Sequence, residues 1–287
     1  MSINSSFSHR NQEPESGVLY LVGTPIGNLN DISLRALNIL KNVSLIACED
    51  TRHTKKIMSK YEFTNSLISF NKHNSSKKIP NLINELKDGK SIAVVSDAGM
   101  PGICDPGEHL VKNVKSHNLE IICIPGPCAA LTALVCSGMS SSKFIFEGFL
   151  PKKKNERKKI LFEISQNVKT TILFESPHRI NSLLEELKQH CGGDREIQVS
   201  RELTKKFEEH IGDTIDNAIE FFKNKEIMGE FTLVIKGKPE SKDLNFNPSI
   251  IKKELSELIK AGLTPSAASK YLAKKKNLTK SMIYNLH

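Results

Sequence analysis

The 287-residue chain contains no tryptophan, only four tyrosines and no CxxC pair. Its thirteen phenylalanines stand mostly in strand-like runs, so the aromatic stacking platforms of a single-strand-binding protein are poorly supported. The absence of paired cysteines argues against a zinc site or any other metal site, and indicates a reducing compartment. The six cysteines stand mostly in apolar surroundings, as small buried thiols do: Cys48, Cys104, Cys123, Cys128, Cys136 and Cys191.

Long apolar runs are also missing. No run approaches the ~20 apolar residues that span a bilayer. The first 17 residues are polar, include Glu13 and Glu15, and contain no apolar core of a signal peptide. We therefore expect a cytoplasmic protein without a membrane partner, with a disordered leader over residues 1–17.

Acidic residues are outnumbered. Forty-one Lys and Arg face 32 Asp and Glu, which gives a formal net charge of +9 and a pI near 9.1. Such a charge attracts polyanions, and nucleic acid is the first partner to consider, although many basic proteins bind none. The charge is densest in PKKKNERKKI, residues 151–160, with six basic residues in ten. A solvated helix face is the alternative to a polyanion contact here; as RNA-binding residues we expect Lys152, Lys153, Lys154, Arg157 and Lys158.

The length suits two domains of about 100 to 150 residues each. Over residues 18–139, short apolar runs alternate with stretches of helical period, such as Ile79, Leu82, Ile83 and Leu86. This rhythm predicts an N-terminal α/β domain with a parallel sheet. Its expected strands are Val18–Val22, Val43–Cys48, Leu67–Phe70, Ser91–Val95 and Glu120–Ile124.

Residues 140–237 predict a second α/β domain of mixed strand direction, with strands at Phe144–Phe149, Thr170–Phe174, Glu196–Ser200 and Glu230–Ile235. Residues 238–248 are polar and have the composition of a linker. Residues 249–287 predict two or three short lysine-rich helices, one of them capped by Thr264 before Pro265. Two interpretations of this segment stay open: a small module that binds nucleic acid, and a helix that docks on the body of the enzyme.

The unusual residues of the first domain follow its strands, where ligands of parallel sheets bind. GTPIGNL follows the first strand, and CEDTRHT, SFNKHN, SDAGMPGICDPG and IPGPCAALTAL follow or end the others. No GxGxxG or GxxxxGK[ST] phosphate motif is present. The glycine turn Gly23–Leu29 therefore predicts a ligand site that is not a phosphate site.

These five motifs, together with FEGFLP, FESPHR and RELTKKFEE in that order, make the chain resemble one family. It is the ribosomal RNA small subunit methyltransferase I family, within the tetrapyrrole methylase (class III) superfamily of S-adenosylmethionine enzymes. The resemblance covers Val18–Ile235. It implies a homodimer of two-domain subunits with the cofactor in the cleft between the domains. It also implies 2′-O-methylation of a cytidine ribose in the decoding region of 16S rRNA, with free rRNA and the 30S subunit both open as substrate.

The resemblance also implies cofactor-binding residues. S-adenosylmethionine carries a sulfonium and a carboxylate but no phosphate, so a glycine turn without a phosphate fingerprint suits it. For Asp105 we favour a turn and helix cap instead. Met100 and Cys104 depart from the residues usual in this loop. The expected cofactor-binding residues are Gly23, Pro25, Asp97, Ala98, Gly99, Ile103, Ala129, Phe174 and Thr232.

Catalysis needs a base for the hydroxyl proton or a cation for the developing alkoxide. The titratable cluster in CEDTRHT suggests Arg52 as phosphate or alkoxide partner and Asp50 or His53 as base, although Asp50 could equally cap the next helix. His178 and Arg179 follow a strand expected to border the cofactor. The general base stays open among Asp50, His53 and His178.

Two other functions stay open. One is a methyltransferase of the same fold that acts on a tetrapyrrole or a protein, although GTPIGNL replaces the GxGxGD-like turn usual in those relatives. The other is a noncatalytic RNA-binding ribosome-assembly factor held by phosphate attraction.

Overall fold

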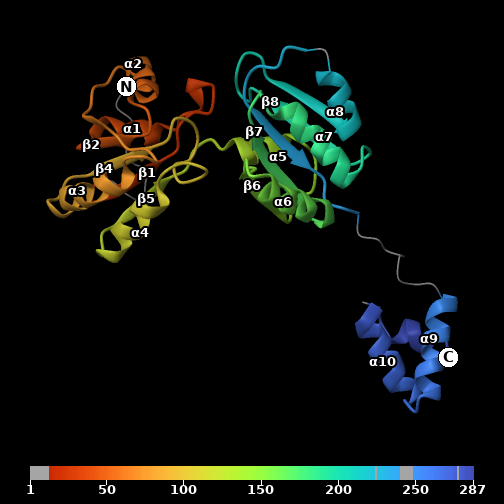
Figure 1. The fold of residues 1–287 in the computed structure, drawn as a ribbon. Helices are drawn as coiled ribbons and strands as arrows, with labels where there is room; N and C mark the ends of the chain where they lie inside the picture. Colours follow the sequence, from red (N-terminus) through yellow and green to blue (C-terminus); the bar gives the residue numbers. More distant parts are fainter. Residues whose placement is uncertain (1–12, 224, 240–247, 277) are drawn as a thin grey trace. The chain divides into compact units, whose positions relative to one another are not determined.

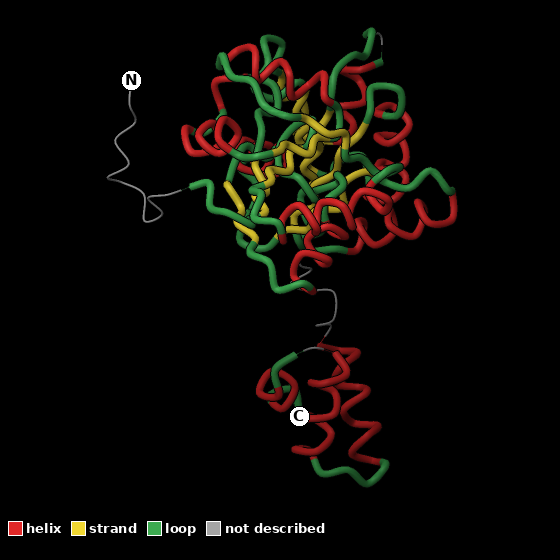
Figure 2. The backbone as a smooth tube through the Cα atoms, turned by 90° about the vertical axis from the view of Figure 1, so that its left-hand side faces the viewer, coloured by secondary structure: helices red, strands yellow, loops and turns green. Residues whose placement is uncertain are grey.

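The structure is a computed structural model that describes residues 13–223, 225–239, 248–276 and 278–287. Contacts divide the chain into two compact units, Met1–Lys238 (unit 1) and Pro239–His287 (unit 2). Unit 1 contains both predicted α/β regions, with helices around the strands, and unit 2 is helical (Figures 1 and 2). The domain boundary between residues 139 and 140 stays a prediction.

The first sheet is parallel throughout, as predicted. Its strand order is β3-β2-β4-β1-β5, so β1 lies between β4 and β5. The five predicted strands are confirmed, each with slightly shorter bounds: β1 Leu19–Val22, β2 Leu45–Cys48, β3 Leu67–Ser69, β4 Ile92–Val95 and β5 Ile121–Ile124.

Helices cover both faces of this sheet because successive strand residues point to opposite sides. Tyr20 and Val22 pack under α1 and α2, whereas Leu19 packs under α3 and α4. The helical spacing of Ile79 and Leu82 is confirmed, since both are buried on α3. These helices are α1 Leu34–Asn42, α2 Thr51–Lys60, α3 Ser75–Lys87 and α4 Glu108–Ser116, with a short 3-10 helix at Leu29–Asp31.

The second sheet has the order β6-β7-β10-β8-β9 and mixed direction, as predicted: β6 and β7 are parallel and the other pairs antiparallel. The edge strand β9 was not predicted, because Ile211 is the single apolar residue in EHIGDT. The strands are β6 Phe144–Phe149, β7 Thr170–Glu175, β8 Glu196–Arg201, β9 Glu209–Thr214 and β10 Phe231–Ile235.

Different helices cover the two faces of the second sheet. α6 (Lys154–Gln166), α7 (Ile180–Cys191) and α8 (Ile215–Phe222) pack on one face. α5 (Ala129–Cys136) packs on the other. The core beneath α5 also contains Ile26, from the turn after β1, and Leu203. The turn after β1 thus contacts elements of the second sheet.

Unit 2 has its own small core. Ile251 and Leu255 of α9 (Pro248–Lys260) pack against α10 (Pro265–Lys276) and Ile283 of α11 (Lys280–Tyr284). The predicted cap is present, because the Thr264 hydroxyl accepts the Ala267 amide at 3.3 Å. Most of the predicted linker lies outside the described residues.

Part of the predicted leader is held in place. Residues 1–12 lie outside the described residues, but Glu13 forms an ion pair with Arg35 at 2.6 Å. The Gly17 amide donates to the Gly89 carbonyl at 3.1 Å. Glu13–Gly17 therefore differ from the disorder that we predicted for them.

The cysteines are less buried than predicted. Cys48 is buried, Cys104, Cys128 and Cys191 are partly buried, and Cys123 and Cys136 are exposed. In the part of the chain that the structure describes, no helix is long and apolar enough to cross a membrane.

Two turns of the first sheet touch through their main chains. The Gly23 amide donates to the Ile124 carbonyl at 3.1 Å. A Cβ at Gly23 would lie 2.7 Å from the Gly126 Cα, and one at Gly126 would lie 2.8 Å from the Gly23 Cα. The two positions therefore need glycine because the main chains approach closely.

We predict that Gly126→Ala lowers the free energy of unfolding by about 1 to 3 kcal/mol, because the added methyl group must push the two turns apart. Thermal and urea unfolding of the full chain measure this change. Val135→Ala, at a side chain that is 77% exposed, is the control and should stay within about 0.5 kcal/mol of the parent. Equal stability of Gly126→Ala and the parent would show that the turns can separate freely.

Candidate active site

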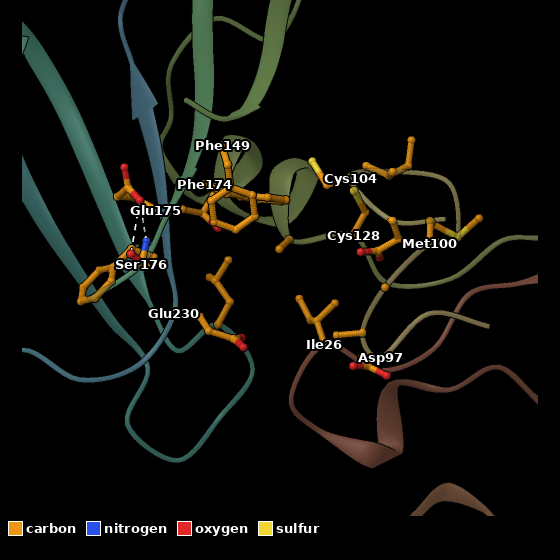
Figure 3. Close-up of a pocket in the computed structure, with 18 of the residues that line it drawn as sticks. Ile26, Asp97, Met100, Cys104, Cys128, Phe149, Phe174, Glu175, Ser176 and Glu230 are labelled. Carbon is orange, nitrogen blue, oxygen red and sulfur yellow. Dashed lines mark hydrogen bonds between the residues drawn. The ribbon is translucent and has the colours of Figure 1, made fainter. Parts of the chain in front are cut away.

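A pocket of about 420 Å³ lies between the loops of the first sheet and the strand ends of the second. Figure 3 shows Ile26, Asp97 and Met100 on one side, facing Phe174 and Glu230 on the other. The residues lining it are Ile26, Glu49, Asp97, Ala98, Gly99, Met100, Ile103, Cys104, Asp105, Cys128, Ala129, Phe149, Phe174, Glu175, Ser176, Pro177, Leu203, Glu230, Phe231 and Thr232.

The loop after β4 is fixed to the turn after β1. Thr24 and Gly99 exchange two main-chain hydrogen bonds, at 2.9 and 3.1 Å. The buried Thr24 hydroxyl also donates to the Ser96 carbonyl at 3.3 Å. These bonds fold the loop back over the end of the sheet, so that Ala98 and Ile103 line the pocket.

Asp50 is a helix cap. Its side chain accepts the Arg52 amide at 2.8 Å at the start of α2. The Arg52 guanidinium also binds both carboxylate oxygens, at 2.5 to 3.0 Å. These hydrogen bonds hold the pKa of Asp50 well below its usual range, which makes it a weak base. Neither Asp50 nor Arg52 lines the pocket, so the structure favours the capping alternative for Asp50.

Asp97 connects the turn after β2 with the pocket. One carboxylate oxygen accepts the Asp50 amide at 2.9 Å, and the other lies 3.8 Å from Nδ1 of His53. Asp97 lines the pocket, whereas the exposed His53 does not. The adjacent strands β2 and β4 thus bring these predicted residues together, but only Asp97 reaches the cavity.

Two further carboxyl groups from the loops of the first sheet line the pocket, Glu49 and Asp105. Burial, followed by the neighbouring charges of Asp105 and Asp97, raises the pKa of Glu49. Burial likewise raises the pKa of Asp105. Our assignment of Asp105 to a helix cap was wrong, because Gly107 is the N-cap of α4 and no side chain bonds there. Glu49 was missed as a pocket residue, although the titratable cluster of CEDTRHT contains it.

The second sheet contributes an aromatic wall. Phe174 packs edge-on against Phe146 and Phe149, with ring centroids 5.0 and 5.7 Å apart. Thr232 is paired with Phe174 across β7 and β10 and lines the pocket beside it. Both predicted residues of this sheet therefore lie at the cavity.

Arg179 has a structural place. Its guanidinium donates to the Leu150 carbonyl at 2.8 Å and lies 3.3 Å from the buried carboxylate of Glu175. The other Glu175 oxygen accepts the Ser176 amide at 2.9 Å (Figure 3). His178 is exposed, and neither His178 nor Arg179 lines the pocket. The structure does not support our assignment of this pair to catalysis, because the pocket is lined by Glu175–Pro177 instead.

The cofactor prediction matches the cavity at seven positions: Asp97, Ala98, Gly99, Ile103, Ala129, Phe174 and Thr232. Gly23 and Pro25 do not line it; from their turn, Ile26 does. Gly23 supports the site from behind through its contact with Gly126. Sequence reasoning missed the side chains of Leu203 and Glu230, although Leu203 lies in RELTKKFEE and Glu230 begins a predicted strand, because neither residue type indicates ligand binding.

The basic segment, residues 151–160, has an exposed side and a buried side. Lys152, Lys153, Lys154 and Lys158 are exposed. Arg157 is buried, donates to Glu186 at 2.7 Å and lies 3.8 Å from Glu175. Our assignment of Arg157 to RNA contact is therefore not supported, because its guanidinium is committed inside the fold.

The family model of the tetrapyrrole (corrin/porphyrin) methylases matches residues 18–219. The chain belongs to this methylase family. Two curated relatives, both named ribosomal RNA small subunit methyltransferase I, come from Synechocystis and Thermotoga maritima. The first is 42% identical, over 94% of this methylase and 97% of the relative. The second is 45% identical, over 77% of this methylase and 99% of the relative.

Solved structures share the methylase fold. A uroporphyrin-III C-methyltransferase from Thermus thermophilus, in complex with S-adenosylhomocysteine, has a TM-score of 0.54 at 14% identity. That comparison covers 76% of this methylase and 96% of the other chain. At this identity the likeness establishes the two-sheet fold that we predicted.

We predict that Arg157→Ala lowers the free energy of unfolding by about 3 kcal/mol, because it leaves the buried Glu175 and the adjacent Glu186 without this partner. Lys158→Ala, on the exposed side of the same helix, is the control and should change stability by less than about 0.5 kcal/mol. Urea unfolding followed by circular dichroism compares the two variants. Similar small decreases in the free energy of unfolding of both variants would show that Arg157 contributes no more to stability than an exposed lysine.

Proposed function

We propose that this methylase transfers a methyl group from S-adenosylmethionine to the small-subunit ribosomal RNA, at the ribose 2′-hydroxyl of a cytidine in the decoding region. The observation that carries the proposal is the 42% identity, over nearly the whole of both chains, to a protein named for this class of substrate. The choice of the cytidine 2′-oxygen rests on the motif resemblance across Val18–Ile235.

The pocket fits the cofactor. Its volume of about 420 Å³ lies within the range of small-molecule sites. Ile26, Ile103 and Phe174 offer apolar surface for an adenosine. Asp97 places negative charge where a sulfonium or an ammonium group would be stabilised. The Ala98–Gly99 backbone would border the ligand without bulky side chains.

Bound S-adenosylmethionine supplies a methyl group on a positively charged sulfur, and the leaving thioether is neutral. The chain's own residues hold the two reactants in line and accept the hydroxyl proton. Alignment of this kind can lower a barrier by up to about 7 to 11 kcal/mol. The Thr24–Gly99 hydrogen bonds and the Gly23–Gly126 contact keep the loops around the pocket in one arrangement, which favours alignment.

RNA contacts would lie at the rim. Lys152 follows Phe149, which lines the pocket, by three residues, so it begins within ~11 Å of the cavity wall along the chain. Arg52, with its side chain 84% exposed, would contact a phosphate rather than the reacting atoms. The homodimer and the cytoplasmic location stay predictions from the resemblance and the composition.

We predict that the purified protein transfers one labelled methyl group per 30S subunit when the subunits come from cells that lack this gene. Nuclease digestion and mass spectrometry should place the label on one cytidine ribose. Free 16S rRNA, tested in parallel, identifies the preferred substrate. Tight binding of S-adenosylmethionine in calorimetry without labelled RNA would contradict the proposed substrate and point to a small-molecule or protein acceptor.

We predict that the double variant Lys152→Ala/Lys154→Ala binds its RNA substrate more weakly and with a shallower salt dependence. The slope of log affinity against log salt should fall by about one for each lysine that contacts a phosphate. Lys87→Ala/Lys115→Ala, which removes exposed charge from α3 and α4, is the control for net charge. Equal slopes in the two double variants would remove the α6 segment from the RNA interface.

A further inference from the structure

In the part of the chain that the structure describes, two carboxylates that line the pocket, Glu49 and Asp105, form no ion pair with a cationic side chain. Asp97 accepts the Asp50 amide and faces His53. Glu175 lies against two arginines, and Glu230 pairs with Lys205 at 3.1 Å. In the described part of the chain, no lysine or arginine forms an ion pair with Glu49 within 4 Å.

The position of Glu49 is fixed by the sheet. It follows the last residue of β2, a central strand, and precedes the helix cap Asp50. Its half-buried side chain lines the pocket, and the exposed Arg52, in the first turn of α2, lies three residues further along the chain. A group at this place lies between the cavity and the surface from which a polyanionic substrate would approach.

The surroundings make Glu49 a stronger base than a free carboxylate. Burial and the facing charges of Asp105 and Asp97 raise its pKa, against smaller opposing effects of Lys72 and of a hydrogen bond from the Asp97 backbone. A carboxylate is a better proton acceptor near neutral pH when its pKa is raised toward the working pH. Asp50, the candidate next to it, has the opposite shift because Arg52 binds it.

We propose that Glu49 is the general base that removes the proton from the substrate hydroxyl. This role rests on the proposed function. The hydroxyl proton moves to a Glu49 carboxylate oxygen while the hydroxyl oxygen forms a bond to the methyl carbon. The bond between that carbon and sulfur breaks, and both electrons go to sulfur. The proton leaves Glu49 for solvent before the next turnover, so the reaction needs no other reactant.

Asp105 is the alternative base, because it also lines the pocket and also has a raised pKa. The Ser96 side chain opposes the raised pKa of Asp105, and Asp105 comes from the loop after β4 rather than from the strand end beside α2. We assign it the role of a charged neighbour that helps to keep the pKa of Glu49 high. The rate of transfer should fall at low pH as Glu49 becomes protonated, and this fall is the acid limb of the pH profile. Asp105→Asn should therefore shift the acid limb to lower pH without removing it.

The test uses the full chain, 30S subunits and radiolabelled S-adenosylmethionine over pH 5 to 8. Glu49→Gln should lower the rate of transfer by about 10²- to 10⁴-fold and abolish the acid limb, which in the parent marks loss of the deprotonated base as pH falls. Glu49→Asp should keep a weaker rate with the limb present. Glu108→Gln, at an exposed carboxylate of α4 outside the pocket, should behave like the parent.

Two measurements besides the rate separate this role from others. In calorimetry, Glu49→Gln should bind the cofactor with the affinity of the parent. Carbon-13 NMR of the parent with labelled glutamate should show one carboxyl group with a pKa above ~4.3, the usual value for glutamate. That signal should be absent in Glu49→Gln. Three results would each overturn the proposal. Glu49→Gln could transfer methyl groups at a rate near that of the parent, or the acid limb could disappear only in Asp105→Asn. Alternatively, a loss of cofactor affinity in Glu49→Gln could account for its lost rate. Failure of the parent itself to methylate 30S subunits or 16S rRNA would instead overturn the proposed function, and this role with it.

Discussion

The pair of main-chain hydrogen bonds between Thr24 and Gly99 is the constraint on which the pocket depends. β1 and β4 are neighbours in the parallel sheet, so the segments that follow them leave at the same edge and can be tied together. The tie turns a long glycine-rich loop into a wall of fixed shape. Ile26, two residues beyond Thr24, then packs into the core beneath α5 and joins that wall to the second sheet.

The electrostatics of the molecule act at two ranges. The net charge of +9 produces a field that attracts polyanions from a distance. The pocket has the opposite character, since Glu49, Asp97 and Asp105 border it without a lysine or arginine ion pair in the described residues. A cationic methyl donor and the proposed RNA substrate would therefore be attracted to different parts of the same unit, without competing for the same charged groups.

The sequence predicted the fold better than it predicted the site. Apolar runs and helical spacing identify the buried strands because burial itself determines which residues they contain. The strand β9 was not predicted, because an edge strand with a solvated face needs few apolar residues. At the site, residue type predicted which loops matter but not where side chains point. Asp50 faces the first turn of α2 and Arg157 faces the core, although each belongs to a motif with functional chemistry. The direction of Arg157 depends on a tertiary partner, Glu186, that local pattern does not reveal. The direction of Asp50 depends on a local partner, Arg52, and is the capping alternative that the sequence left open.

The contact between Gly23 and Gly126 has a consequence for how such a protein can diverge. Main-chain atoms make this contact, so it does not depend on the size or charge of the neighbouring side chains. The neighbouring positions can therefore change with the substrate. The two glycines themselves cannot change separately, because a side chain at either one would meet the backbone of the other. Residues around the pocket can therefore be replaced without disturbing this support, provided that both Gly23 and Gly126 stay glycine.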